Sequence, residues 1–165
     1  MEILHGSSNW MEEFKSMLPF LGHRNWILIV DKAFPAQSTA GIKYIDTRQE
    51  LLPTLRDVLK EISNNAPHLS PIIYTDMELK YMTDSLSPGV QDLRKNIYSA
   101  LEDFHVNTLL HEDVFKKLDE AASMFEVLVL KTDTLKPYTS LFIELDCGYW
   151  SSDKEEKLRE NMKLG

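Results

Sequence analysis

Hydrophobic positions along the chain change repeatedly between two spacings. Apolar residues recur every three or four positions, as in a helix with one buried face, over residues 10–18, from about 52 to 65, over 90–104 and over 112–124. Short apolar runs rich in β-branched residues separate these segments at 26–30, 72–75, 106–110, 127–130 and 141–145. We therefore predict helices and strands that alternate along the chain.

The run WILIV at residues 26–30 is apolar at every position. This pattern is typical of a strand buried on both faces of a parallel sheet. Strands that alternate with helices favour parallel pairing through right-handed crossovers. The sequence thus predicts an α/β fold, a three-layer sandwich with a mostly parallel, Rossmann-like sheet. We expect a single α/β domain over residues 1–150, followed by a charged C-terminal tail over 151–165.

Length and charge restrict the class of partner. At 165 residues the chain is about one domain long, and its net charge of −8 comes without any long run of Lys and Arg, which argues against nucleic acid. No apolar run approaches the ~20 residues that cross a membrane. The first ten residues lack the apolar stretch of a secretory signal. We expect a cytoplasmic protein with no nucleic-acid and no membrane partner, whose ligand is uncharged or cationic.

Common catalytic motifs are absent from the sequence: it has no glycine-rich phosphate loop, no HExxH, no GxSxG and no CxxC pair. His5, His68 and His105 show no mutual spacing of metal ligands. We therefore predict no metal site and no cofactor.

Polar residues at the ends of predicted strands are the remaining candidates, because open α/β sheets bind ligands there. Asp31 follows the strand at 26–30, and His111 follows the strand at 106–110. Each has a plainer alternative role, as a turn cap for Asp31 and as a solvated helix start for His111. His23 lies in a Gly-His turn before a strand, where a histidine is often only solvated.

A turn stiffened by proline lies between the last two predicted strands. Its residues Tyr138, Thr139 and Ser140 follow Pro137 and offer a phenol, two hydroxyls and free backbone amides. A purely structural turn is the alternative.

Three of these segments, taken in order, resemble the D-ribose pyranase and L-fucose mutarotase family. Gly22-His23, the strand, Asp31 and Phe34-Pro35 are similar to its N-terminal signature. His111-Glu112 followed by Phe115-Lys116 resembles its His-Glu-Glu-Phe-Lys segment, with one extra residue here. The turn at 137–140, an apolar strand and Gly148 resemble its Pro-Tyr-Ala-Asn, strand and Gly.

The resemblance implies a mutarotase or pyranase that interconverts ring forms or anomers of a free monosaccharide by acid/base catalysis, without a cofactor. It implies His23 as the catalytic acid/base. The implied sugar-binding residues are Asp31, His111, Tyr138, Thr139 and Ser140, with Lys116 as a possible contact.

One departure from the family pattern keeps other functions open. Ser140 stands where the family has Asn, and a hydroxyl replaces an amide that both donates and accepts. A non-catalytic sugar-binding or regulatory module of the same fold is the alternative. A nucleotide-binding Rossmann-like domain is a third, with only the fold class behind it.

The spacing of His23 and Asp31 predicts an assembly. They flank a strand and stand eight residues apart in the chain. At ~3.3 Å per extended residue they should lie on the order of 20–25 Å apart, too far for one sugar to touch both. The resemblance implies ring-shaped oligomers with sites between adjacent subunits. Unless the loop at Gly22-His23 folds back over the sheet, we therefore predict a cyclic homo-oligomer with composite sites.

Overall fold

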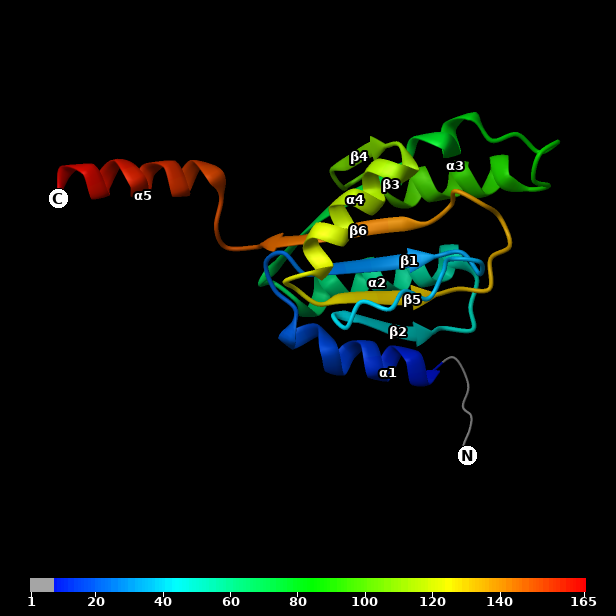
Figure 1. Ribbon diagram of the computed structural model, residues 1–165, viewed down its shortest axis with the longest axis horizontal. Helices are drawn as coiled ribbons and strands as arrows, with labels where there is room; N and C mark the ends of the chain where they lie inside the picture. The colour runs from blue at the N-terminus through cyan, green and yellow to red at the C-terminus, as the bar shows by residue number, and fades with distance from the viewer. Residues whose placement is uncertain (1–7) are drawn as a thin grey trace.

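The structure, a computed structural model, describes residues 8–165 as alternating strands and helices around one sheet (Figure 1). In chain order the elements are α1 (Ser8–Met17), η1 (Leu18–Phe20), β1 (Trp26–Val30), β2 (Ile42–Asp46), α2 (Leu51–Asn65), β3 (Leu69–Asp76), η2 (Met77–Tyr81), α3 (Val90–Ala100), β4 (Val106–Leu109), α4 (His111–Ala122), β5 (Val127–Lys131), β6 (Leu141–Cys147) and α5 (Ser152–Leu164). Residues 1–7 lie outside the described residues. They include the start of the predicted domain and most of the segment used to argue against a secretory signal.

The sheet has six strands in the order β2-β5-β1-β6-β3-β4. β1 and β2 both pair parallel with β5, and β4 pairs parallel with β3, whereas β6 runs antiparallel to β1 and β3. The α/β prediction with a mostly parallel sheet is confirmed. This strand order differs from the doubly wound order of a Rossmann fold, so the Rossmann-like part of the prediction is not confirmed.

β6 is the strand that departs from parallel pairing. A parallel return needs a crossover of a dozen or more residues, usually with a helix. Only residues 132–140 connect β5 to β6, and they contain no helix. The connection therefore crosses the end of β1, and β6 enters the sheet in the opposite direction.

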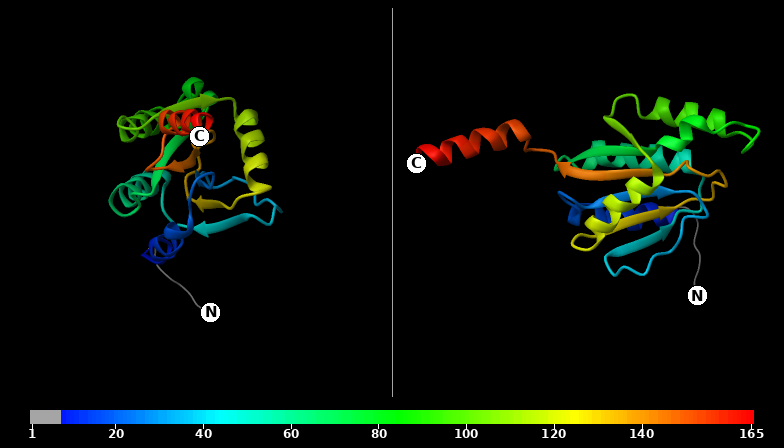
Figure 2. Two further views of the ribbon diagram at one scale, coloured as in Figure 1. Left: turned by 90° about the vertical axis from the view of Figure 1, so that its left-hand side faces the viewer. Right: turned by 45° about the horizontal axis from the view of Figure 1, so that its top comes forward.

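Helices cover both faces of the sheet, as the end-on view in Figure 2 shows. Side chains of β1 alternate between two clusters: Ile27 and Ile29 pack with α1, α2 and α3, while Trp26, Leu28 and Val30 pack with α4. All five are buried, as the continuous apolar run predicts.

One strand, β2, was absent from the prediction, and the tail predicted as charged contains a helix. β2 is an edge strand that pairs with β5, and Ile45 is its one fully buried residue, so its hydrophobic signal is weak. The tail forms α5, which begins at a cap where the Ser151 hydroxyl accepts from the Lys154 N–H. α5 has no buried residue and projects from the body of the molecule (Figure 1). Within residues 8–165, no helix combines the length and apolarity needed to cross a membrane.

Gly148, the last residue of the family-like pattern, sits where two backbone segments touch. Its N–H donates to the carbonyl of His68, and a Cβ at this position would lie 2.5 Å from the carbonyl oxygen of Pro67. A residue with a side chain would force the backbone apart, so glycine fixes the end of β6 against the start of β3.

Candidate functional site

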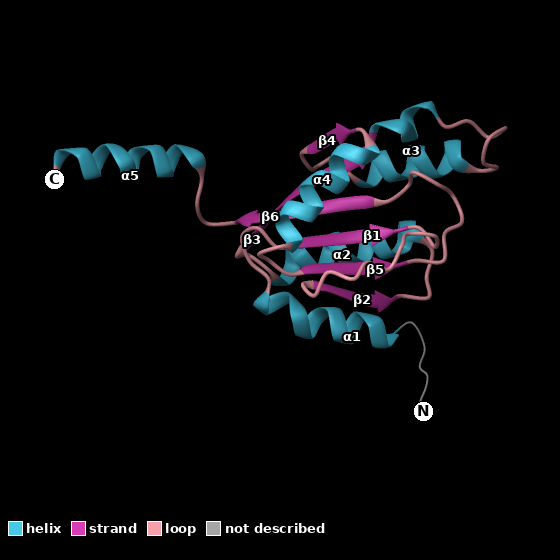
Figure 3. Ribbon diagram, in the orientation of Figure 1, coloured by secondary structure: helices cyan, strands magenta, loops and turns pink. Residues whose placement is uncertain are grey.

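Three predicted site segments meet at the edge of the sheet where β1 and β5 end and β6 begins (Figure 3). The Ser140 hydroxyl donates to Oδ1 of Asp31 over 2.8 Å, and the backbone N–H of Asp31 donates back to the Ser140 oxygen over 3.2 Å. Ser140 is buried, whereas Asp31 is half-buried. This reciprocal pair exists because the β5–β6 connection crosses over the end of β1.

The turn that follows Asp31 is held by side chains and backbone of the β5–β6 connection. The Lys131 ammonium donates to the carbonyls of Lys32 and Phe34, and the Lys32 N–H donates to the carbonyl of Thr134 over 2.8 Å. Lys32 in turn pairs with Asp133 at 3.1 Å. The turn therefore has a fixed shape beside the Asp31 carboxylate.

His111 starts α4 on the same edge and is held at both its ring and its backbone. Ring atom Nδ1 lies 2.9 Å from Oδ2 of Asp76, the last residue of β3. The His111 backbone N–H donates to both carboxylate oxygens of Glu78, at 3.0 and 3.2 Å. Glu78 thus accepts a hydrogen bond from an N–H that has no partner within the helix, and places a negative charge at the positive end of the helix dipole.

Aromatic rings enclose the imidazole of His111. The ring of Phe115, one turn later in α4, lies edge-on with centroids 4.7 Å apart, and that of Tyr138 lies edge-on at 5.5 Å. Tyr138 has a φ of 62°, a left-handed conformation that is uncommon for a residue with a side chain. This backbone conformation sets the direction in which the phenol leaves the turn.

These contacts leave a pocket of about 240 Å³, lined by Asp31, Ala33, Phe34, Pro35, His111, Pro137 and Tyr138. The lining combines a carboxylate acceptor, an imidazole and a phenol with apolar carbon from two prolines and a phenylalanine. Such a mixture of few placed polar groups and apolar walls is typical of small-molecule sites. Among residues 8–165, no group of three or more His, Cys, Asp or Glu side chains is arranged to hold a metal ion.

Burial dominates the electrostatics of Asp76. Its side chain is 0% exposed, and burial raises its pKa from 3.8 to about 6. His111 lowers this pKa by its charge and hydrogen bond, while the neighbouring carboxylates Glu78 and Asp31 raise it. Of these three carboxylates, the most buried one, Asp76, is the one in contact with the His111 ring.

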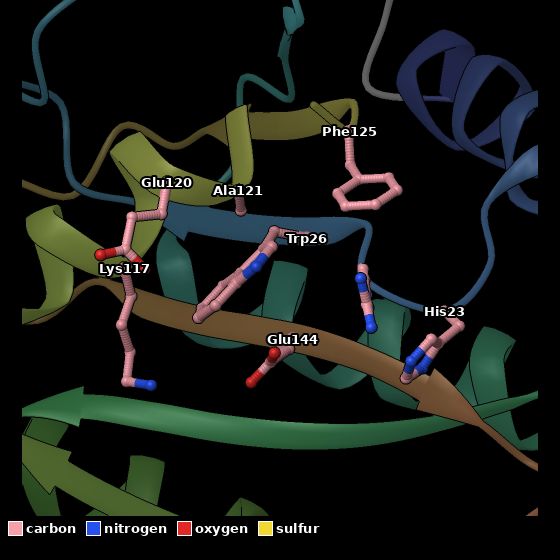
Figure 4. Close-up of a pocket in the computed structure, with 8 residues that line it drawn as sticks. His23, Trp26, Lys117, Glu120, Ala121, Phe125 and Glu144 are labelled. Carbon is pink, nitrogen blue, oxygen red and sulfur yellow. The ribbon is translucent and has the colours of Figure 1, made fainter. Parts of the chain in front are cut away.

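The structure places His23 away from this pocket, at the opposite end of β1. Its Nδ1 lies 2.9 Å from Oδ1 of Asp146, and its side chain is 56% exposed. His23 lines a second, larger pocket of about 440 Å³ with Trp26, Lys117 and Glu144 (Figure 4). Asp31 and His23 are therefore not brought together within one chain.

The second pocket has its own polar network. The Tyr74 hydroxyl donates to Glu144 over 3.0 Å, and the Tyr74 ring stacks on Trp26 at 5.5 Å. Burial, with Glu144 second, raises the pKa of Tyr74 to about 12. Lys117 lies over the Tyr74 ring at 5.5 Å. This face is charged but holds no imidazole other than that of His23 among its lining residues.

Three other predicted residues, Ser140, Thr139 and Lys116, are not among the residues that line the first pocket. Thr139 is buried, and its hydroxyl donates to the carbonyl of Lys136 over 2.7 Å inside its own turn. Lys116 is exposed on α4, 3.8 Å from Asp113.

Sequence reasoning missed Asp76 and Glu78. Asp76 ends a strand just as Asp31 does, so the rule that selected Asp31 could have selected it. The segment from residue 76 onward instead reads as a polar connection, although Thr75 and Asp76 are both buried. Glu78 lies in the short helix η2, which has no periodic signal of its own.

Comparisons with known proteins find sugar-handling relatives of similar sequence or fold. No family model matches the chain. A D-ribose pyranase from Limosilactobacillus fermentum is 24% identical over 135 residues, covering 80% of this chain and 89% of the relative. RbsD from Bacillus subtilis, solved with D-ribose, shares the fold with a TM-score of 0.59 and 22% identity over 88% of this chain and 98% of its own. The fucose mutarotase from Streptococcus pneumoniae, solved with L-fucose, has a TM-score of 0.58 and 14% identity over 87% and 98%. The chain is thus similar in sequence to a D-ribose pyranase over most of its length and shares the fold of RbsD and of the fucose mutarotase, which supports the family resemblance of its three segments.

Proposed function

We propose that the chain binds a free monosaccharide in the pocket of Asp31, His111 and Tyr138 and catalyses interconversion of its ring forms or anomers. The observation that carries the proposal is the meeting of these three side chains in one pocket of about 240 Å³. The names of the relatives support the substrate class, since one is a D-ribose pyranase and one a fucose mutarotase.

The chemistry needs an acid and a base but no cofactor. Opening a cyclic hemiacetal removes the proton of the anomeric hydroxyl and protonates the ring oxygen, and an imidazole can do either near neutral pH. Positioned acid/base groups contribute roughly 10²–10⁴-fold in rate. That range suffices for a reaction that already proceeds slowly in water.

Asp31 and Tyr138 are proposed to hold the sugar hydroxyls. Ser140 is proposed to act through Asp31, because its hydroxyl already donates to that carboxylate. The sugar-binding roles predicted for Thr139 and Lys116 have less support. Thr139 is buried and its hydroxyl donates to the carbonyl of Lys136, and Lys116 is exposed and does not line the pocket.

We further propose that His23 reaches this pocket from a neighbouring copy of the chain, in a cyclic homo-oligomer. The proposal is supported by the position of His23 at the opposite end of β1 from Asp31 and by its exposure of 56%. Asp146 orients the His23 ring at 2.9 Å, as a proton-transfer group requires. The cytoplasmic location expected from the sequence remains a prediction.

The alternative is a sugar-binding or regulatory module without catalysis. It is favoured by Ser140, because a hydroxyl committed to Asp31 offers the sugar neither of the two functions of an amide. The two functions differ in one respect that can be measured: both bind a sugar, but only the enzyme accelerates ring exchange.

Sugar binding predicts a thermal shift. Across a panel of aldoses, at least one present at 100 times its Kd should stabilise the protein by ~2.7 kcal/mol. The Asp31→Ala variant should lose this shift, while His105→Ala, which changes an exposed histidine outside the pocket, should keep it. Equal shifts in the wild type and the Asp31→Ala variant would place the sugar elsewhere.

A further inference from the structure

Asp76 is buried without being fully satisfied. Its side chain is 0% exposed, Oδ2 contacts Nδ1 of His111 at 2.9 Å, and Oδ1 has no hydrogen-bond partner within the described part of the chain. A buried carboxylate with one oxygen unpaired is costly for folding. Packing does not require it, since an apolar residue would fill the same space. The contact with His111 is what distinguishes this position.

The two nitrogens of the His111 ring have different surroundings. Nδ1 faces the buried carboxylate, and the side chain as a whole is 37% exposed and lines the pocket. No side chain or carbonyl among residues 8–165 forms a hydrogen bond with Nε2. Nε2 is therefore the atom that a ligand in the pocket can reach.

We propose that Asp76 is the positioning residue of His111: it accepts the Nδ1–H and so presents the Nε2 lone pair to a sugar hydroxyl. This inference rests on the function proposed for the pocket. A carboxylate on one imidazole nitrogen fixes the tautomer and stabilises the imidazolium that forms when the other nitrogen takes a proton. His111 is thereby assigned the base of the reaction in addition to its predicted part in binding.

The proton and electron pairs balance without a redox partner. His111 Nε2 takes the proton of the anomeric hydroxyl, the C1–O bond to the ring oxygen breaks, and its electron pair goes to that oxygen. The ring oxygen takes a proton from the second imidazolium, proposed to be His23 of the neighbouring copy, and C1 becomes the aldehyde carbon. Closure to the other ring form or anomer reverses these steps.

The titratable groups near His111 come from four segments of the chain. Asp31 follows β1, Asp76 ends β3, Glu78 lies in η2, and the phenol of Tyr138 comes from the β5–β6 connection. Glu78 contacts only the backbone N–H of His111, not its ring. Glu78→Gln is therefore a matched control. It also removes a carboxylate that contacts His111, but one that does not bind the ring and so does not set its tautomer.

The test compares Asp76→Asn with Glu78→Gln by two readouts. Nitrogen-15 NMR of the histidine rings should show His111 as the Nδ1–H tautomer in the wild type and in Glu78→Gln. In Asp76→Asn, whose amide can also donate to Nδ1, the Nε2–H tautomer should appear. Ring exchange of a bound sugar should fall about 10²-fold in Asp76→Asn, the acid limb of its pH profile should move to lower pH, and Kd should change little.

Folding provides an independent check of the Asp76→Asn variant. The folded pKa of Asp76, about 6, exceeds its ordinary 3.8, so the folded state binds the proton more tightly than the unfolded state. Its contribution to stability is present below pH 3.8 and is lost as pH rises through about 6. As the pH rises over this range, the melting temperature of Asp76→Asn should therefore increase relative to that of the wild type. A variant that melts at or above the wild-type temperature at pH 7.5 is folded, and its loss of exchange cannot be assigned to unfolding.

The two readouts test the positioning role of Asp76 separately from the proposed function. An unchanged tautomer in Asp76→Asn, or unchanged exchange with an unmoved pH profile, overturns the positioning role. If the wild type shows no exchange with any sugar, the proposed function fails, while the tautomer comparison still tests the contact between Asp76 and His111.

Discussion

Replacing His23 by alanine is expected to slow sugar ring exchange about 10²–10⁴-fold while changing sugar affinity little. An acid/base group acts in the transition state, so its loss lowers turnover more than binding. His23 is suited to this role because it is exposed and carries Asp146 at 2.9 Å on its other ring nitrogen. Magnetisation-transfer NMR measures the exchange rate, and calorimetry measures the affinity.

Asp31→Asn serves as the contrasting variant. It removes the charge of the acceptor but keeps an oxygen for the Ser140 hydroxyl, so the turn should persist. We expect weaker sugar binding as its main effect, since a hydroxyl acceptor acts in both the ground state and the transition state. Equal loss of affinity in both variants, with turnover intact in His23→Ala, would contradict the assignment of roles.

Mixed oligomers of His23→Ala and Asp31→Asn chains are expected to be more active than either variant alone when the sugar is below the weakened Kd of Asp31→Asn. If each site takes His23 from one subunit and Asp31 from its neighbour, random 1:1 assembly of His23→Ala with Asp31→Asn chains leaves both groups intact at about one quarter of the sites. The geometry that motivates this expectation is the placement of His23 and Asp31 at opposite ends of β1.

The controls for this mixture are simple. Each variant alone should keep its own reduced activity after the same dissociation and reassembly. A double variant mixed with the wild type should give no gain over dilution. Monomeric behaviour at working concentration would contradict the shared site. The absence of recovery in oligomers verified to contain both chains would do so as well.

Much of the fold could be predicted because its strongest signals are local. Trp26–Val30 is apolar throughout and buried on both faces, and α2 follows its amphipathic pattern from Leu51 to Asn65. β2 was not predicted, because an edge strand with one neighbour buries few side chains and so has a weak hydrophobic pattern. Ile45 is its one buried residue. The direction of β6 could not be read from hydrophobicity, since an apolar strand has the same pattern in either direction.

The site residues that could be predicted are polar residues that directly follow a predicted strand. Asp31 and His111 were selected by position, and the structure places both in one pocket. The contact between Asp76 and His111 joins residues 35 apart in the chain, and nothing in either local sequence indicates it. Such pairs depend on which strand ends lie side by side, here β3 and β4, and this is a property of the sheet order.

Ring exchange of free D-ribose and L-fucose, followed by magnetisation transfer with the protein present in far lower amount than the sugar, measures catalysis directly. We predict that the wild-type protein accelerates exchange between ring forms or anomers of at least one of these sugars or a related aldose. We also predict that His111→Ala, which removes an imidazole from the pocket, loses the acceleration. If no aldose exchanges faster while one still binds, the protein is a sugar-binding module and not an enzyme.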